Sequence, residues 1–469
     1  MLTIALLLLA CGSDPAKDAD SGPPAVSTTD PTTPTGTPTG TTPTGPTGPA
    51  GMLQFDGPAP TNILWVSIDT LRHDVWARYG GEDVMPFLDE KMAEGFVLDD
   101  VHQCSNWTGA GTSCTMSGRH GIDDGFEPLL SANNGVDFVP DETVFFAEIL
   151  RDRGYRTELL TTNGWLGAEW GNTQGFDTER GLGGWKAGPV FDEALTDLLS
   201  GPTDEPWFFH VHLFDPHAPY DPPEEYLGEL EGRSRLPWDL SSRTEHYAIA
   251  DDRLSLSPDL QAELETQLRI RYKAEITYMD DMIDDIWPVF DAAGLLDDTL
   301  VVFWADHGES FWEHEHQTHA WDLYDEENQV AMFFWAKNLA PGAYAGPVST
   351  IDLVPTLLEL YDIEAPPTMT GIPIDDIELG RVRYSMSNAR AGIVQSVTRG
   401  TQRIQFYWRD GLVVVTDAAT DPAETINLYG PADPLTLEMW DLLLPRVLQA
   451  EAALDTTRWP LTWPPELPR

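Results

Sequence analysis

Runs of consecutive apolar residues mark the first elements that can be predicted along this chain. Residues 62–68 form such a run, and it ends at Asp69. Because a strand covered on both faces needs apolar side chains at every position, the run predicts a strand inside a sheet. Similar runs predict further buried strands at residues 207–214, 300–304 and 330–336.

Helical patterns alternate with these strands. Helices are expected at residues 85–94 and 143–153, and residues 259–290 have the pattern of one long amphipathic helix. Strands that alternate with helices are typical of the α/β class. We therefore predict a doubly wound, mostly parallel central sheet flanked by helices, in a main domain at residues 59–365.

The pattern changes after residue 365. Short strands are expected at residues 404–408 and 412–416, and a terminal helix at residues 434–454. We interpret residues 366–469 as a small C-terminal α+β subdomain that packs on the main sheet.

Polar residues with metal-ligand chemistry follow two of the predicted strands. Asp69 ends the first, and Asp306 and His307 follow the strand at residues 300–304. In open α/β sheets, ligands bind beyond the carboxyl ends of the strands, so these side chains are expected to lie together. Carboxylates and an imidazole suit one divalent ion such as Ca²⁺, Mg²⁺, Mn²⁺ or Zn²⁺. An isolated Asp after a strand is more often a helix N-cap, but two such strand ends favour a metal site.

Several segments, in the same order along the chain, resemble the sulfatase family of the alkaline phosphatase superfamily. The resemblance extends from about residue 60 to the C-terminus, and it implies a metal-dependent ester hydrolase in which residues 59–365 are the catalytic domain. The segments are residues 62–80 with Ser-Ile-Asp-Thr-Leu-Arg, residues 211–220 with Phe-Asp-Pro-His-Ala-Pro, residues 306–326 with Asp-His-Gly-Glu, residues 351–358, and residues 421–428 with Asp-Pro-Ala-Glu.

The resemblance implies roles for individual residues. Asp69, Asp306 and His307 match the metal ligands of the family. His217 and His319 match basic side chains that contact the ester or assist the leaving group, although each can instead be a hydrogen-bonded loop histidine. The weaker candidates, each with a purely structural alternative, are His212 and His314 as further basic groups, and Arg72 and Arg119 as bidentate contacts to a tetrahedral anion.

The nucleophile position departs from the family pattern. When Ser117-Gly118-Arg119 is used as the anchor, Thr108 stands where sulfatases carry the Cys or Ser that becomes formylglycine. Thr cannot form formylglycine, because oxidation of its secondary alcohol gives a ketone. The usual Pro and the usual Arg or His of this stretch are Ala110 and Thr112, and Thr70 replaces a second acidic ligand.

A threonine hydroxyl can still act as a nucleophile when a cation binds it, because coordination favours the alkoxide. Thr108 is therefore expected to be both a metal ligand and the nucleophile. Threonine nucleophiles occur in relatives such as nucleotide phosphodiesterases and the phosphoethanolamine and lipoteichoic acid transferases. Those transferases are similar to this chain in placing one carboxylate, a Thr and an Asp-His pair on one metal.

Three functions stay open at this point. The first is hydrolysis of sulfate or phosphate esters, with esters of glycans or lipids among the candidate substrates. The second is a transferase that moves phosphoethanolamine or phosphoglycerol onto an envelope glycan or lipid. The third is a metal-binding lipoprotein without catalysis, which the altered stretch after Thr108 would suit.

The charge of the chain excludes one class of partner. Its 469 residues include 77 Asp and Glu but 27 Lys and Arg, which gives a formal net charge of -50. Such a surface repels nucleic acid, so no nucleic-acid partner is expected. It also repels anionic polymers unless a cation neutralises the local site. The negative charge can instead have no role in partner choice and simply keep the protein soluble.

The N-terminal segment predicts attachment to a membrane. Leu8-Leu9-Ala10-Cys11 follows an apolar run and resembles the bacterial lipobox, so residues 1–11 are interpreted as a lipoprotein signal peptide with Cys11 lipidated. The run is too short to span a bilayer, which needs about 20 residues. Residues 12–58 are rich in Pro, Thr and Gly, which predicts a disordered tether. We expect a lipoprotein of the cell envelope that contacts the membrane through its lipid anchor only.

The other two cysteines leave two alternatives. Three cysteines are too few for a disulfide scaffold. Cys104 and Cys114 can form one disulfide in an oxidising envelope, or they can be two unpaired core thiols.

Overall fold

The computed structural model describes residues 53–124, 139–184, 186–202, 205–231 and 236–469. The predicted signal peptide, the lipidation at Cys11 and most of the predicted tether lie outside the described residues. Among the described residues, every helix is too short or too polar to cross a membrane.

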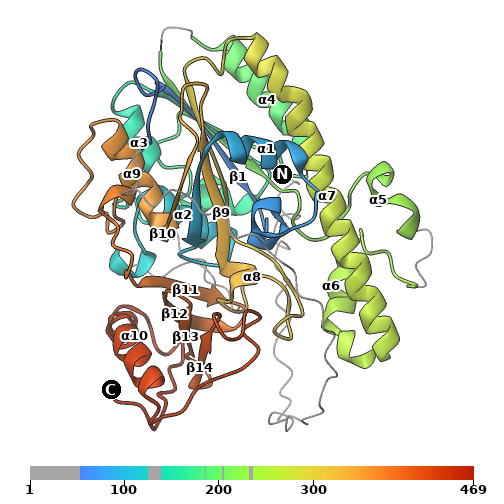
Figure 1. Cartoon of the computed structure of the whole chain (residues 1–469), viewed down its shortest axis with the longest axis vertical. Helices are drawn as coiled ribbons and strands as arrows, with labels where there is room; N and C mark the ends of the chain where they lie inside the picture. Colours follow the sequence, from blue (N-terminus) through green and yellow to red (C-terminus); the bar gives the residue numbers. More distant parts are fainter. Residues whose placement is uncertain (1–52, 125–138, 185, 203–204, 232–235) are drawn as a thin grey trace, which may run out of the picture. The chain divides into compact units, whose positions relative to one another are not determined.

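Eight strands form the central sheet, in the order β10-β2-β9-β6-β1-β5-β3-β4 (Figure 1). All neighbouring strands run parallel except β9, which is antiparallel to both β2 and β6. The predicted mostly parallel sheet is therefore confirmed. The strands are β1 (Asn62–Ile68), β2 (Phe96–His102), β3 (Arg156–Thr161), β4 (Thr178–Gly181), β5 (Trp207–Leu213), β6 (Thr299–Ala305), β9 (Gln329–Trp335) and β10 (Gly342–Ser349).

Helices flank the two faces of this sheet, as predicted. In Figure 1, α1, α4 and α7 lie on one side of the strands, and α2, α3 and α9 lie on the other. The α-helices of this part of the chain are α1 (Pro86–Glu94), α2 (Thr108–Ser117), α3 (Phe146–Arg151), α4 (Ala187–Ser200), α5 (Glu224–Glu231), α6 (Arg243–Asp251), α7 (Pro258–Ala292), α8 (Asp325–Asn328) and α9 (Leu353–Leu360). The 3-10 helices are η1 (His73–Val75), η2 (Ala77–Tyr79), η3 (Gly121–Asp124), η4 (Gly164–Leu166), η5 (Ala168–Trp170), η6 (Arg253–Ser255), η7 (Thr350–Asp352) and η8 (Ile374–Asp376).

The middle of the sheet is its most apolar part. Every residue of β5 and β6 is buried, as the continuous apolar runs predicted. The ring of Trp65 on β1 lies 5.8 Å from those of Phe208 and Trp304, on the two neighbouring strands. Aromatic packing of this kind fixes how the strands align, and so it also fixes which residues come at their ends.

A second, antiparallel sheet follows in the C-terminal part. Its strands pair in chain order, and α10 packs on β12 and β13. Phe406 and Trp440 centre a separate hydrophobic cluster, with ring centroids 5.4 Å apart. The α+β character was predicted, whereas the domain boundaries stay predictions. The elements are β11 (Arg383–Ala389), β12 (Gly392–Arg399), β13 (Gln402–Tyr407), β14 (Leu412–Asp417) and α10 (Pro434–Ala453), and a small hairpin in the main domain is formed by β7 (Ser310–Phe311) and β8 (Gln317–Thr318).

Candidate active site

Three side chains converge at the carboxyl ends of β1 and β6. The strand register pairs Ile68 with Ala305, so the next residues, Asp69 and Asp306, come at the same level of the sheet. Asp69, Asp306 and His307 are fully buried, and each offers a ligand atom within 4.8 Å of the other two. The Nε2 atom of His307 is 3.6 Å from Asp69 Oδ1 and 3.6 Å from Asp306 Oδ2. The structure thus brings together the three side chains proposed to bind metal.

One oxygen of each carboxylate lacks a hydrogen bond. Among the described residues, no donor reaches Asp69 Oδ1 or Asp306 Oδ2, the two oxygens nearest His307 Nε2. Burying a carboxylate oxygen without a partner is costly, so this pair of orphaned atoms fits a cation between them. Two hard oxygens and one imidazole suit a divalent ion and do not select one.

The two carboxyl groups have opposite pKa shifts. Burial, together with the charge of Asp69, raises the pKa of Asp306 to about 6. Burial also acts to raise the pKa of Asp69, but the neighbouring His217, His212 and His307 outweigh it and lower that pKa to about 2. A divalent cation at this position would favour the ionised form of both groups.

Thr108 lies at the edge of this group. It is the first residue of α2 and is buried, and its Oγ1 lies 3.4 Å from His307 Nε2. The unpaired N–H groups at the start of a helix carry partial positive charge, which favours an anion at this end of α2. The close approach of α2 requires Gly111, because a Cβ there would lie 2.8 Å from the backbone oxygen of Asp306. The predicted metal ligands and the predicted nucleophile therefore share one location.

Asn163, which follows β3, is a site residue that sequence reasoning missed. Its Nδ2 donates to Asp69 Oδ2 at 2.7 Å and to Thr108 Oγ1 at 3.1 Å. The same amide orients both the carboxylate and the hydroxyl, and its Oδ1 accepts a hydrogen bond from Trp165 N. In the sequence, Asn163-Gly164 resembles an ordinary turn, so its only local signal is its position just after a strand.

His319 and His217 complete the centre. The imidazole of His319 lies with its centroid 4.3 Å from that of His307 and 5.0 Å from that of His217. Glu309 Oε1 holds His319 Nδ1 at 3.0 Å, and Tyr220 donates to the other oxygen of Glu309 at 3.0 Å. Burial lowers the pKa of both histidines, so both are neutral in this environment. Neutral imidazoles can accept and return a proton.

His212 is placed behind Asp69. Its Nδ1 is 2.7 Å from Ser67 Oγ, and its Nε2 is 3.4 Å from Asp69 Oδ2. This contact is on the oxygen of Asp69 that also accepts from Asn163, which leaves Oδ1 facing His307. His212 thus orients the carboxylate from inside the sheet, as supporting residues of metal sites do.

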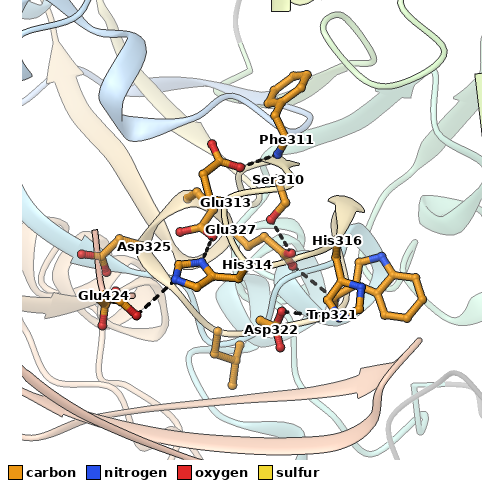
Figure 2. Close-up of polar contacts among 12 residues, drawn as sticks. Ser310, Phe311, Glu313, His314, His316, Trp321, Asp322, Asp325, Glu327 and Glu424 are labelled. Carbon is orange, nitrogen blue, oxygen red and sulfur yellow. Dashed lines mark hydrogen bonds and ion pairs between the residues drawn. The ribbon is translucent and has the colours of Figure 1, made fainter. Parts of the chain in front are cut away.

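His314 is not brought to the centre. Its ring stacks on Tyr324 at 3.6 Å, its Nδ1 is 2.5 Å from Glu326 Oε1, and its Nε2 is 3.2 Å from the backbone oxygen of Glu424. Figure 2 shows His314 contacting Glu424, which belongs to the C-terminal part of the chain. Both ring nitrogens therefore have partners away from His307, and a catalytic role for His314 stays a prediction.

Two arginines were expected to contact the anion. Arg72 donates to both carboxylate oxygens of Asp74, to Glu313 and to the backbone oxygen of Glu309, so its guanidinium supports the loop after His307. Arg119 follows Gly118, the residue that ends α2, and is buried. Contact of either arginine with an anion stays a prediction.

A disulfide joins Cys104 to Cys114, with their Cα atoms 6.6 Å apart. Of the two alternatives, the structure contains the bonded pair. Cys104 precedes Thr108 and Cys114 lies within α2, so the bond ties the loop before the helix to its second half.

A partly exposed lysine holds the loop that carries His217 by pairing with two buried carboxylates. Lys186 Nζ lies 2.9 Å from Asp215 Oδ1 and 2.6 Å from Glu275 Oε1. Both carboxylate side chains are 1% exposed, whereas Lys186 is 31% exposed. Asp215 also accepts from the backbone N–H of Ala187 at 2.9 Å. Asp215, two residues before His217, is thereby tied to the start of α4 and to α7.

Replacing Lys186 with Met should destabilise the fold and disturb the site together. Two buried carboxylates would lose their shared cation, which we expect to lower the free energy of unfolding by about 2–3 kcal/mol, the low end for such pairs because Lys186 is partly exposed. Displacement of the His217 loop should lower kcat by about tenfold or more. Denaturant unfolding and ester turnover measure the two effects.

Lys273→Met is the matched control, because Lys273 pairs with the exposed Glu82 at 2.6 Å. We expect it to change stability by no more than about 0.5 kcal/mol. A Lys186→Met protein with the stability and kcat of the parent chain would show that Lys186 does not position His217.

The family model described as Sulfatase matches residues 61–363, which is more than half of the chain. The chain belongs to the sulfatase family. The match contains every member of the centre described above, from Asp69 to His319. Membership also implies a divalent metal, and Asp69, Asp306 and His307 are the group in the described part of the chain that could hold it.

Two sulfatases of known function illustrate the relationship. The chain is 27% identical over 266 residues to a choline-sulfatase of Rhizobium meliloti (strain 1021), a match to 50% of this chain and 49% of that protein. It is 20% identical over 477 residues to an N-acetylglucosamine-6-O-sulfatase of Bacteroides thetaiotaomicron, covering 79% of this chain and 83% of that protein. The chain thus spans about half the length of the choline-sulfatase that it matches.

Solved structures agree on the fold of this sulfatase-family chain. One, described as bound to its substrate D-glucosamine-2-N,6-O-disulfate, superimposes with a TM-score of 0.67 at 17% identity, over 84% of this chain and 98% of that chain. A phosphonate monoester hydrolase from Silicibacter pomeroyi gives a TM-score of 0.64 at 18% identity, over 85% of this chain and 96% of that chain. The alkaline phosphatase-like fold class is confirmed by these likenesses.

Proposed function

We propose that this chain is a metal-dependent hydrolase of sulfate esters in which Thr108 is the nucleophile. The observation that carries the proposal is the position of Thr108 Oγ1, 3.4 Å from His307 Nε2, beside the two unpaired carboxylate oxygens and at the start of a helix. Family membership and the relatives named as sulfatases support the substrate class. A divalent cation, when bound by Asp69, Asp306 and His307, would supply Lewis-acid polarisation.

The residues of the chain divide the reaction into two steps. In the first, Thr108 Oγ1 loses its proton to a neutral imidazole and forms a bond to sulfur, while the bond from sulfur to the ester oxygen breaks. We assign to His217 and His319 the uptake of that proton and the return of one to the departing alcohol. Asn163 orients Thr108 Oγ1 during the attack.

In the second step, water releases the sulfate. Its oxygen attacks sulfur, the bond to Thr108 Oγ1 breaks, and Thr108 regains a proton. The sum is one ester and one water giving one alcohol, one sulfate and one proton. Burial of His319 and of the carboxylates keeps these groups in a low-dielectric environment, where each electrostatic contact is stronger than in water.

One assay panel tests this function. The purified protein is stripped with a chelator, reloaded with Mg²⁺, Ca²⁺, Mn²⁺ or Zn²⁺, and given an aryl sulfate, an aryl phosphate, an aryl phosphonate monoester and an aryl phosphodiester. We expect metal-dependent release of free sulfate, with kcat/KM at least about tenfold higher for the sulfate ester.

The other outcomes distinguish the competing functions. Faster turnover of the phosphorus esters would move the activity to the chemistry named for the Silicibacter relative. Transfer to an added alcohol instead of water would indicate the transferase. If the protein binds metal but turns over none of the four esters, the result would indicate a metal-binding protein without catalysis.

A further inference from the structure

The turn between β11 and β12, two strands of the C-terminal sheet (Figure 1), contacts residues on two sides of the centre. On one side, Asn388 Oδ1 accepts a hydrogen bond from Nε1 of Trp107, the residue before Thr108, at 3.0 Å. On the other side, the backbone N–H of Arg390 donates to the backbone oxygen of Ala320, the residue after His319, at 3.1 Å. The turn is therefore anchored both beside the nucleophile candidate and beside a histidine of the centre.

Arg390 projects from this turn between two aromatic rings. Its guanidinium carbon lies 5.5 Å from the centroid of Trp321 and 5.9 Å from that of Tyr247, and the residue is half-buried. Trp321 is itself fixed, because it stacks on His316 at 4.3 Å and donates from Nε1 to the backbone oxygen of Gln317 at 3.2 Å. Figure 2 shows the stacked pair of Trp321 and His316. Rings at these distances hold a guanidinium through cation–π attraction and leave its N–H groups free to bind.

The contacts of Arg390 place it beside the centre. Its backbone N–H binds the backbone oxygen of Ala320, the residue after His319, and its guanidinium lies over the ring of Trp321, the next residue along. Because the side chain is half-buried, part of it can still be reached from solvent.

Arg390 differs from other cations that lie near the centre or in the C-terminal sheet. Within the described ranges, no carboxylate approaches its guanidinium within 4.0 Å, and its contacts are the two rings and the backbone bond. Lys186 and Arg403, in contrast, are each held by two carboxylates. In a chain with 77 acidic and 27 basic residues, an arginine beside the site that pairs with no described acid is available for an external anion.

We propose that Arg390, framed by Trp321 and Tyr247, is a specificity-determining residue that binds a second anionic group on the leaving-group side of the substrate. This inference rests on the proposed hydrolase function and names its substrate class: esters whose alcohol carries a carboxylate or a further sulfate. Both groups match the planar fork of a guanidinium. A chain with a net charge of -50 repels such substrates unless a local cation compensates, and Arg390 provides one beside the centre.

The test compares substrates that differ only in the second charge. The probes are phenyl sulfate, 3-carboxyphenyl sulfate and the bis-sulfate of benzene-1,3-diol. For the parent chain we expect kcat/KM about tenfold or more higher for the two dianionic esters. Arg390→Met should reduce these two values by about 10- to 100-fold, mainly through KM, and the value for phenyl sulfate by less than about threefold. Arg390→Lys, which keeps the charge but loses the fork, should fall between.

Arg409→Met is the matched control. Arg409 lies in another turn of the same sheet, between β13 and β14, and is exposed. We expect it to keep all three rates. The larger of the two losses in Arg390→Met identifies which anion, carboxylate or sulfate, the residue prefers.

The contrary outcomes separate the two proposals. Equal loss on all three esters in Arg390→Met, or a parent chain without preference for the dianionic esters, would overturn the role of Arg390 while leaving the hydrolase intact. If the parent chain turned over none of the three esters, the result would contradict the hydrolase function and, with it, the role of Arg390. Thermal unfolding of both Arg390 variants, expected to match the parent, excludes loss of fold as the cause.

Discussion

Replacing Thr108 with Ala should reduce kcat/KM on the preferred ester by about 10⁴-fold or more, while the protein still binds its metal. The substitution removes the hydroxyl that would form the covalent intermediate, and removal of a nucleophile costs on this scale. Asp69, Asp306 and His307 all remain, so metal content should stay near one equivalent. Steady-state kinetics and elemental analysis of the same preparation measure both quantities.

Two variants make this result specific to the hydroxyl. Thr108→Ser keeps a hydroxyl at the start of α2 and should retain activity within about 30-fold. Thr115→Ala removes a buried hydroxyl on the same helix, which bonds to the backbone oxygen of Gly111 at 2.8 Å, and should leave turnover as it is. Full activity in Thr108→Ala would refute the nucleophile assignment, whatever the other two variants show.

Replacing Asp306 with Asn should abolish metal binding and yet stabilise the metal-free protein. In the metal-free state, the charge of Asp306 lies buried beside Asp69, and one oxygen of each carboxylate has no donor among the described residues. An amide removes that repulsion and can keep the bond from the backbone N–H of Thr70, so we expect a gain of about 1–3 kcal/mol in chelator. Activity should fall by about 10³-fold or more.

Thermal unfolding with chelator and with excess metal measures the effect. The parent chain should gain about 2.7 kcal/mol at a metal concentration of 100 Kd, and Asp306→Asn should gain nothing. Asp280→Asn is the control, because Asp280 is also buried but accepts the backbone N–H groups of Phe87 and Leu88 in α1. It should keep the metal-dependent gain. Normal metal content in Asp306→Asn would remove this residue from the ligand set.

The sequence predicted the middle of the sheet better than its borders. The central strands β1, β5, β6 and β9 are covered on both faces. Such strands have continuous apolar runs, because none of their positions faces solvent and needs a polar residue. β4 and β10 are the two edge strands, with exposed positions and, in β10, Gly346 and Pro347. β2 is interrupted by Asp99 and Asp100, which pair with Arg78 and Arg383 from distant segments. Such ion pairs depend on tertiary contacts, so no local sequence pattern predicts them.

The centre was partly predictable for a similar reason. Residues directly after buried strands of a parallel sheet meet at one edge of the sheet. This rule predicts from the sequence that Asp69, Asp306 and His307 lie close together. Asn163 was missed because it follows β3, a strand whose mixed sequence gave no signal. The pairing of Arg72 with Asp74 and Glu313 could not be predicted, because the fold brings these groups together and a sequence does not show which cations are already neutralised.

The hairpin of β11 and β12 lies outside the family match, whereas the three side chains that could hold a metal lie inside it. The family match ends at residue 363, twenty residues before β11 begins at Arg383. A protein shortened at that border would retain its proposed metal ligands and nucleophile but would lose the turn that carries Asn388 and Arg390. Homologues could then exchange this one turn and acquire new substrates without altering the inherited chemistry.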